Sequence, residues 1–445
     1  MQEELITMLE QKRFHELSRL LRDQTGPDIA ALVDEIPAQY LPLVYRLLPK
    51  DLAADAFVSM DPDVQELLIA ALSDSELQEV LTLLFVDDTV DIVEEMPANV
   101  VKRILQNSTA DKRRQINEIL RYPDDSAGSI MTTEYVDLRK DMVVAEAFAH
   151  IRATGLNKET IYTCYVTDEN RMLLGLVTVR TMLLSEASQR LEEIMETNII
   201  FARTLDDRED VAKQFDKYGF LALPVVDREN RLVGIVTFDD AMDVIQEEAE
   251  EDFEKMAAMS PSEETYFKTS VFGHAKHRIL WLLILMLSAT FTGAIITKYE
   301  SAFSAIPMLV AFIPMLMDTG GNCGAQSSTM VIRGMAVDEI RLKDFFKVLF
   351  KEFRISLIVG GTLAVVNFVR VYVMYQNAAI GLVTGLSLIG AVIIAKLLGC
   401  ILPMTAKKLK LDPAIMASPI ITTIVDACSV LQGRLSWWLY GSGYG

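Results

Sequence analysis

Several residue types that enzymes and disulfide-rich proteins depend on are scarce or widely scattered in this chain. The four cysteines, Cys164, Cys323, Cys400 and Cys428, lie far apart, with no CxxC pair and no histidine near them at metal-ligand spacing. Zinc sites and disulfide frameworks need such clustering, so the sequence indicates neither. It also lacks a nucleophile–base pair, a metal triad and a phosphate-binding loop, so we do not expect an enzyme.

Basic residues are also scarce relative to acidic ones. Lys and Arg number 42 against 62 Asp and Glu, which gives a net charge of -20. Such acidity repels phosphates, so we expect no nucleic-acid partner. The acid is concentrated before residue 255 or so, whereas Ile, Leu, Val, Ala, Gly and Met dominate from 279 onward. The N-terminus has no signal-peptide core. These patterns predict a cytoplasmic acidic half followed by a membrane half.

Residues 1–125 are predicted to form an all-α superhelical domain. Short apolar-periodic segments end in Pro or acidic turns such as EIP, SMDP and EMP, which stop one helix and cap the next. Asp87 and Asp91 lie one helical turn apart within a run of five acids between 87 and 95. Such a run is commonly a solvated face, and the functional alternative is half of a divalent-cation site.

Residues 126–248 contain an internal repeat, with copies at 126–188 and 189–248. Asp168, Gly175 and Thr178 recur as Asp227, Gly234 and Thr237, at a constant offset of 59. Each copy is predicted to run β-α-β-β-α. The motif in LPVVDRENRLVGIVTFDD resembles a tandem pair of CBS domains, a family whose members bind adenine nucleotides or cations as regulators. That resemblance implies Thr237 and Asp239 as candidate nucleotide contacts.

The rest of the chain is predicted to hold an acidic connecting helix, 249–276, and a membrane domain, 277–445. Five apolar spans are expected, each near the length that a bilayer requires: Ile279–Thr297, Ala302–Met317 continuing to Ile332, Ile355–Tyr375, Ala379–Met404 and Pro413–Leu431. Lys and Arg flank the first span and fill alternate loops, which predicts a cytoplasmic N-terminus and an external C-terminus. Arg370 and Lys396 lie within spans, and we expect both to snorkel to the interface.

The fifth span carries one acid, Asp426. A carboxylate within a membrane segment is costly and by default marks an ion or substrate path. Ser418, Thr422 and Asp426 recur every four residues, so they share one helix face and predict part of a cation-conducting wall. The alternative is an acid that caps a helix or reaches the interface.

The second span carries the segment DTGGNCGAQSSTM. Gly320, Gly321 and Gly324 are expected to break or loosen the helix, which is tolerated where the backbone lines a cavity. Asn322 and Gln326 follow at helical spacing, and we expect them, with Gly321, to line the ion pathway. The alternative is a seam of small residues that only packs helices.

In this order the parts resemble the MgtE family of magnesium channels, and "TGGNCGAQ" and "PIITTIVD" are the most specific features. The resemblance implies a homodimer in a lipid bilayer, the cell (inner) membrane, with Asp426 of both subunits holding hydrated Mg²⁺. It implies cytosolic Mg²⁺ sensor sites that close the pore, and ATP as a further ligand. The implied sensor residues are Asp87, Asp91, Glu209, Asp240, Asp243, Glu248, Glu251 and Asp252. In this chain Gly219 replaces an acid of the family's pattern.

Two other functions remain open from the residues themselves. Nothing in the residue types separates Mg²⁺ strongly from Co²⁺, Mn²⁺ or Ca²⁺ as the transported ion. A membrane-tethered CBS sensor that conducts nothing is the alternative from another class, and it predicts tolerance of substitution at Asn322 and Asp426.

Overall fold

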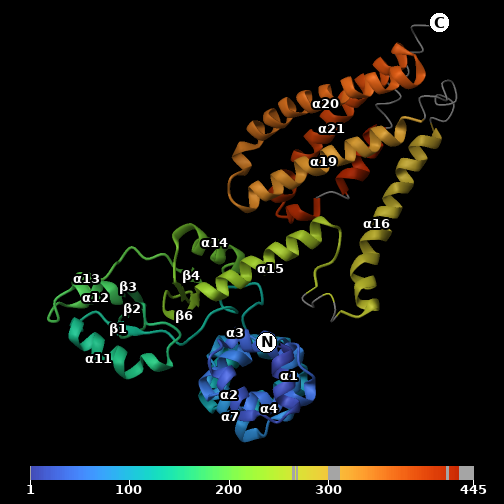
Figure 1. Cartoon of the computed structure of the whole chain (residues 1–445). Coiled ribbons are helices and arrows are strands. Elements are labelled where there is room, and N and C mark those ends of the chain that lie inside the picture. Colours follow the sequence, from blue (N-terminus) through green and yellow to red (C-terminus); the bar gives the residue numbers. More distant parts are fainter. Residues whose placement is uncertain (1, 263–265, 267–268, 299–310, 417–419, 430–445) are drawn as a thin grey trace. The chain divides into compact units, whose positions relative to one another are not determined.

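The computed structural model describes every residue except 1, 263–265, 267–268, 299–310, 417–419 and 430–445 (Figure 1). The chain divides into two compact units, Met1–Gln246 and Glu247–Gly445. The first unit contains an N-terminal helical domain and two α/β modules. The second contains the long apolar helices.

The N-terminal domain consists of short helices that wind into the ring seen end-on in Figure 1. They are α1 Gln2–Glu10, α2 Phe14–Arg22, α3 Gly26–Asp34, η1 Ala38–Tyr40, α4 Leu41–Arg46, α5 Lys50–Val58, α6 Pro62–Ala71, α7 Asp74–Leu83, α8 Val86–Glu95, α9 Ala98–Asn107 and α10 Ala110–Ile119. Most of their apolar faces share one core that runs from Leu5 to Ile104, and Val86 and Val90 of α8 form a second cluster with Ile116 and Ile119 of α10. The predicted superhelix of short helices is confirmed.

Prolines and side-chain caps divide these helices as the sequence predicts. Pro49 and Pro97 stand at the N-caps of α5 and α9, where a fixed φ suits a helix start. Ser73 begins α7 with a capping box, in which its hydroxyl accepts from the Glu76 N–H while the Glu76 carboxylate accepts from the Ser73 N–H. Thr109 likewise caps α10 by accepting from the Lys112 N–H, so side-chain caps mark the starts of α7 and α10.

Each α/β module holds a three-stranded sheet in the order parallel, then antiparallel. The first contains β1 Asp137–Arg139, α11 Val144–Thr154, η2 Gly155–Asn157, β2 Thr163–Thr167, β3 Leu173–Thr178, α12 Val179–Leu184 and α13 Leu191–Ile194. The second contains β4 Ala202–Arg203, α14 Arg208–Tyr218, β5 Ala222–Val226, β6 Leu232–Thr237 and α15 Phe238–Met256. The predicted β-α-β-β-α order is present in both.

The two modules exchange their leading segments. Met131, which starts the first copy in sequence, packs on Gly234 of the second sheet, and Met195 packs on Gly175 of the first. A Cβ at either glycine would lie 2.7 Å from the methionine sulfur. The same exchange pairs Thr132 with Ile235 in a β-bridge. The repeat detected in the sequence is therefore interlocked in space.

The acidic connecting segment is helical over a different range from the one predicted. Helix α15 continues directly from β6 at Phe238 and ends at Met256, and the next helix begins at Val271. Asp240 accepts from the N–H and the hydroxyl of Thr237. This bond caps the first turn of α15 and explains why the helix begins at the end of the strand.

The second unit is built from α16 Val271–Lys298, α19 Ile313–Ala336, η3 Leu342–Asp344, α20 Phe345–Tyr375, α21 Ala378–Lys408 and η4 Pro413–Met416, and residues 420–429 are also helical. Three segments, Val271–Lys298, Leu342–Tyr375 and Ala378–Lys408, are long and apolar enough to cross a membrane. They correspond to the first, third and fourth predicted spans. The second and fifth spans run over residues outside the described part, so five spans stay a prediction.

Two predictions about these helices are wrong. Helix α19 continues without interruption through Gly320, Gly321 and Gly324, because helix 420–429 and α21 pack closely against those glycines. Lys396 does not snorkel: its side chain is buried and lies 3.8 Å from a Glu352 carboxylate oxygen. The negative partner makes burial of the lysine tolerable.

Candidate functional site

One face of α19 is polar over more than two turns. Asp318, Asn322 and Gln326 follow one another at intervals of four residues, and all three are exposed in the single chain. Four-residue spacing places their side chains on the same side of the helix. The residues between these three are small, so the helix presents a continuous polar stripe over this stretch.

The glycines of α19 form a contact surface for helix 420–429. A Cβ at Gly320 would lie 2.8 Å from Val425, and one at Gly324 would lie 2.6 Å from Ile421. A Cβ at Gly321 would collide with the methyl group of Thr422. These glycines let two helices approach closely, as small residues do in membrane bundles. Gly321 is buried in this contact, and its place in the ion pathway stays a prediction.

Asp426 follows Val425, which contacts Gly320 of α19, so the helix that carries Asp426 packs against the helix that carries Asp318. Asp426 and Thr422 are half-buried. Ser418 lies outside the described residues. Asp426 is the only acid of its predicted span, whereas Asp318 stands out in the sequence beside Asn322 and Gln326 without being predicted as a pathway residue. The spacing of Asp318 with Asn322 and Gln326 was the signal that could have identified it.

In the first unit, helix α8 presents the acids predicted as half of a cation site. Asp87 is buried at 6% exposure, and its Oδ1 has no hydrogen-bond partner in the described part of the chain. Asp91 is exposed. Burial raises the pKa of Asp87 well above its usual range, and the charges of Asp240, Asp88 and Glu159 raise it further. The structure therefore brings Asp240 of α15 near Asp87 of α8, although 153 positions separate their residue numbers.

Asp240 is held at the start of α15. Burial raises its pKa to about 7, against the lowering effect of its hydrogen bond from the Thr237 hydroxyl. That hydroxyl already donates to Asp240. The predicted nucleotide contact Thr237 therefore makes its side-chain hydrogen bond within the chain. Asp239 beside it is exposed. Asp240 thus combines a capping role with a place in the acidic cluster.

Three further charged residues at this cluster were not predicted from the sequence pattern. Glu134 accepts from the Val86 N–H at 2.8 Å, so a carboxylate of the first CBS-like copy caps the N-terminus of α8. Burial raises the pKa of Glu159 to about 8, and one of its oxygens is buried without a partner among the described residues. Lys112 is buried and donates to the carbonyls of Leu81 and Leu84.

The other predicted sensor residues lie on α14 and α15. Glu209 pairs with Lys213 at 2.6 Å, and Glu251 pairs with Lys255 at 2.6 Å. Burial, and then the charge of Asp239, raises the pKa of Asp243. Glu248 and Asp252 are half-buried. Within the described residues, no group of three or more His, Cys, Asp or Glu converges as a metal site.

Gly219, where the family resemblance predicts an acid, has a structural reason to be glycine. It ends α14 in a left-handed conformation with φ of 67°, and its N–H donates to the Phe215 carbonyl. Left-handed helix ends favour glycine because no Cβ clashes there. The residue terminates the helix.

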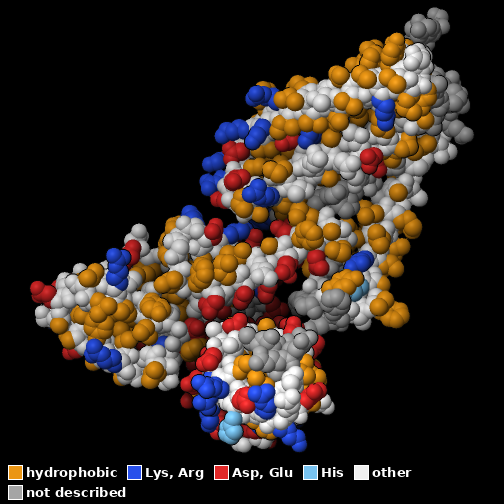
Figure 2. All heavy atoms as spheres, viewed as in Figure 1, with side chains coloured by type: hydrophobic (Ala, Val, Ile, Leu, Met, Phe, Trp, Pro, Cys, Tyr) orange, Lys and Arg blue, Asp and Glu red, His pale blue; other side chains and the backbone are white. Residues whose placement is uncertain are grey.

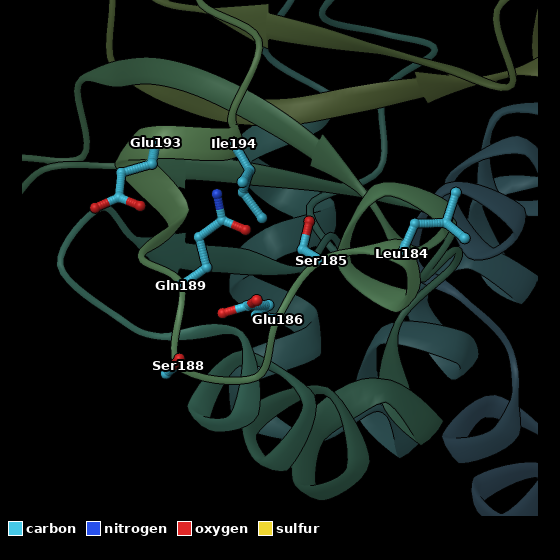
Figure 3. Close-up of a pocket in the computed structure, with 7 residues that line it drawn as sticks. All are labelled: Leu184, Ser185, Glu186, Ser188, Gln189, Glu193 and Ile194. Carbon is cyan, nitrogen blue, oxygen red and sulfur yellow. The ribbon is translucent and has the colours of Figure 1, made fainter.

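The pocket in Figure 3 lies between α12 and α13 of the first module. It is an open hollow of about 560 Å³, lined by Leu184, Ser185, Glu186, Ser188, Gln189, Glu193 and Ile194. Its two glutamates disfavour a phosphate group by charge. Neither Thr237 nor Asp239 lines it, so it does not correspond to the predicted nucleotide contact.

Figure 2 shows how charge is distributed on one face of each unit. Acidic side chains gather along α15 and over the N-terminal helices, whereas hydrophobic side chains cover α16, α19 and α20. Lys and Arg gather where α19 joins α20. A basic loop between apolar helices is typical of the cytoplasmic side of a membrane.

Family models match most of the chain. A model described as "Divalent cation transporter", MgtE, matches residues 313–432, the MgtE intracellular N domain matches 26–125, and the CBS domain matches 127–187 and 191–247. The magnesium transporter MgtE of Thermus thermophilus is 35% identical over 93% of this chain and 93% of its own length. The chain belongs to the MgtE family. The magnesium transporter MgtE of Bacillus subtilis is 31% identical over 93% of this chain and 94% of its own length.

Two solved structures resemble about half of this chain. The cytosolic domain of the Mg²⁺ channel MgtE in complex with ATP has a TM-score of 0.52 and 34% identity, and it covers 55% of this chain and all of that one. The soluble part of a magnesium transporter has a TM-score of 0.52 and 28% identity, with 56% of this chain and all of that one covered. These likenesses agree with the predicted helical N-domain and tandem CBS modules.

Proposed function

We propose that this chain transports Mg²⁺ across the cell membrane, along a path that includes Asp426, Thr422 and the polar stripe of α19. The carrying observation is the close packing of helix 420–429, which carries Asp426, on the glycines of α19, which carries Asp318. Mg²⁺ gives up water reluctantly and is usually bound through one or two carboxylates with waters retained. Relatives with this architecture are magnesium transporters by name.

The transporting form is a homodimer, with the polar stripe of α19 turned toward the second subunit. Asp318, Asn322 and Gln326 are exposed in the single chain, and hydrocarbon is a poor environment for such side chains. A second copy would cover the stripe and enclose water for a hydrated ion. The N-terminal domains are cytoplasmic, and the C-terminus is external if all five spans form.

Cytosolic Mg²⁺ closes the path through acidic sensor sites. The residues we propose for these sites are Asp87, Asp91, Glu209, Asp240, Asp243, Glu248, Glu251 and Asp252. The unpartnered Asp87 Oδ1 and the nearby Asp240 support a cation that neutralises both carboxylates. Because like charges repel when no cation is present, binding favours a closed arrangement of the cytosolic parts. About 5 kcal/mol of differential binding is enough to reverse such an equilibrium.

ATP is proposed as a further ligand of the CBS pair. The support is a relative whose cytosolic domain was solved in complex with ATP. Asp239, exposed at the start of α15, is the candidate contact to a ribose hydroxyl. Replacing it by Asn is expected to weaken ATP binding in calorimetry without changing the melting temperature.

The transport proposal is tested by Mg²⁺ flux into liposomes. Asp426→Asn keeps the shape of the side chain and removes its charge, so we expect flux to be lost. Asp338→Asn is the matched control, because Asp338 is exposed and pairs with Arg341 just after α19 ends. Unchanged flux in Asp426→Asn would overturn the pathway, and no flux in the unmodified protein would favour a non-conducting sensor. Competition by Co²⁺ or Mn²⁺ distinguishes the other divalent ions.

A further inference from the structure

A buried polar network joins three helices of the membrane unit. The Ser327 hydroxyl of α19 donates to Glu352 Oε2 of α20 at 2.6 Å. Lys396 Nζ of α21 donates to the Ser327 oxygen at 3.1 Å and lies 3.8 Å from Glu352 Oε2. The side chains of Lys396 and Glu352 are 6% and 13% exposed. Ser327 therefore bridges a buried ion pair.

The network lies beside the closest approach between α19 and α21. One turn from Lys396, a Cβ at Gly399 would lie 2.5 Å from the Gly324 carbonyl oxygen. Gly324 in turn contacts Ile421 of helix 420–429, the helix that carries Asp426. On the neighbouring position of α19, the Ser328 hydroxyl donates to the Met416 carbonyl at 3.3 Å. A shift of α19 at Ser327 would therefore move the contacts that position helix 420–429.

Stability alone does not account for this ion pair. A buried pair loses hydration on both partners, and apolar residues of similar volume are often as stable or more stable. In a membrane the cost of charge is higher still, so an ionisable residue there marks function by default. Without a partner, the charge of Lys396 beside α19 would also repel cations. Glu352 neutralises that charge.

We propose that Lys396, Glu352 and Ser327 are positioning residues for transport, which hold α19 in the register that the ion pathway requires. The inference rests on the proposed Mg²⁺ transport. Glu352 and Lys396 fix α19 to α20 and α21, and Ser327 transmits that position to the polar stripe of the same helix. None of the three needs to touch the ion.

The decisive variant is the double substitution Lys396→Met with Glu352→Gln, because it removes both charges without leaving one buried alone. We expect its melting temperature in detergent to stay near that of the unmodified protein, while its Mg²⁺ flux per folded protein falls by about tenfold. Lys396→Met alone leaves Glu352 unpaired, so it is expected to lower both quantities. Ser327→Ala, which keeps both charges, provides a milder disturbance of the same network.

The ratio of Mg²⁺ to Co²⁺ uptake separates positioning from a purely structural role. A loss of folded protein scales both rates equally, whereas a displaced α19 changes their ratio. We expect the ratio to change in the double variant and in Ser327→Ala, and to stay constant in Lys351→Met, an exposed lysine beside Glu352. Wild-type flux with an unchanged ratio in the double variant would overturn this inference and leave the transport proposal intact. Lower flux with an unchanged ratio would assign the network a structural role and overturn it as well. An unmodified protein without flux would overturn the transport proposal on which it rests.

Discussion

At the scale of single residues, the cytosolic acids divide into two kinds. Glu76 accepts from Arg46 and from Ser73, and these bonds hold its pKa at about 2. Burial, together with the charges of the nearby Asp88, Asp239 and Asp240, instead raises the pKa of Glu159 to about 8. Glu76 stabilises the start of α7 in its ionised form. Glu159 is instead favoured in its protonated, neutral form in the folded protein. A bound cation could take the place of that proton.

This difference predicts how stability responds to pH without divalent ions. Between about pH 4.5 and about pH 8, folded Glu159 keeps a proton that the unfolded chain has lost. The free energy of unfolding therefore falls as pH rises through this range. Glu159→Gln is expected to flatten the decline, as measured by melting temperature against pH in a chelating buffer. Glu169→Gln, an exposed acid of the same module, is the control, and equal slopes in both variants would contradict the prediction.

At the scale of elements, α19 is the helix on which the second unit depends. It packs on α21 through Gly324 and Gly399, and on helix 420–429 through Gly320, Gly321 and Gly324. Three glycines within five positions predict a broken or loosened helix, but α19 is continuous. Glycine weakens an isolated helix, but in a membrane bundle it also permits close packing that compensates. The alternative interpretation, a seam of small residues, accounts for the glycine face.

Two glycine substitutions test this packing. In Gly324→Ala the new methyl group would lie 2.6 Å from Ile421 and 3.3 Å from the Ala395 carbonyl, so we expect destabilisation of about 1–3 kcal/mol. Gly361→Ala on α20 meets nothing within 4 Å and should be neutral or stabilising by up to about 1 kcal/mol. Thermal unfolding in detergent measures both. If Gly324→Ala melts no earlier than Gly361→Ala, the close contact is not tight in solution.

At the scale of the whole molecule, acid is concentrated in the first unit and on α15, whereas apolar surface is concentrated on the long helices of the second. Helix α15 runs across the boundary between the units at Gln246 and Glu247. A ligand that changes the charge balance on α15 therefore acts on the segment that links them covalently. This connection supports the proposed closure of the ion path by cytosolic Mg²⁺.

Limited proteolysis tests that coupling. We expect trypsin cleavage within and after α15 to slow as Mg²⁺ rises, because bound cations relieve repulsion among its acids and order the segment. The double variant Asp91→Ala with Glu248→Ala should need more Mg²⁺ for the same protection. Asp51→Ala, an exposed acid on α5, is the control. Protection that is independent of Mg²⁺, or equal in both variants, would contradict the sensor proposal.

Much of the fold could be predicted from the sequence because its signals are local. Prolines and capping residues mark the short helices, the offset of 59 between Asp168 and Asp227 marks the repeat, and apolar runs mark α16, α20 and α21. The polar stripe of Asn322 and Gln326 also followed from helical spacing. These features depend on neighbours within a few turns or on a direct repeat of residues, which a single sequence contains.

Contacts between distant positions were decided only by the tertiary structure. Sequence spacing could not indicate that Met131 packs on Gly234, that Glu134 caps α8, or that Lys396 pairs with Glu352 across 44 positions. Whether a buried charge is paired depends on which helices meet and how they are rotated. The sequence by itself therefore determined the order and type of the elements. Tertiary packing decided which of their polar groups neutralise one another.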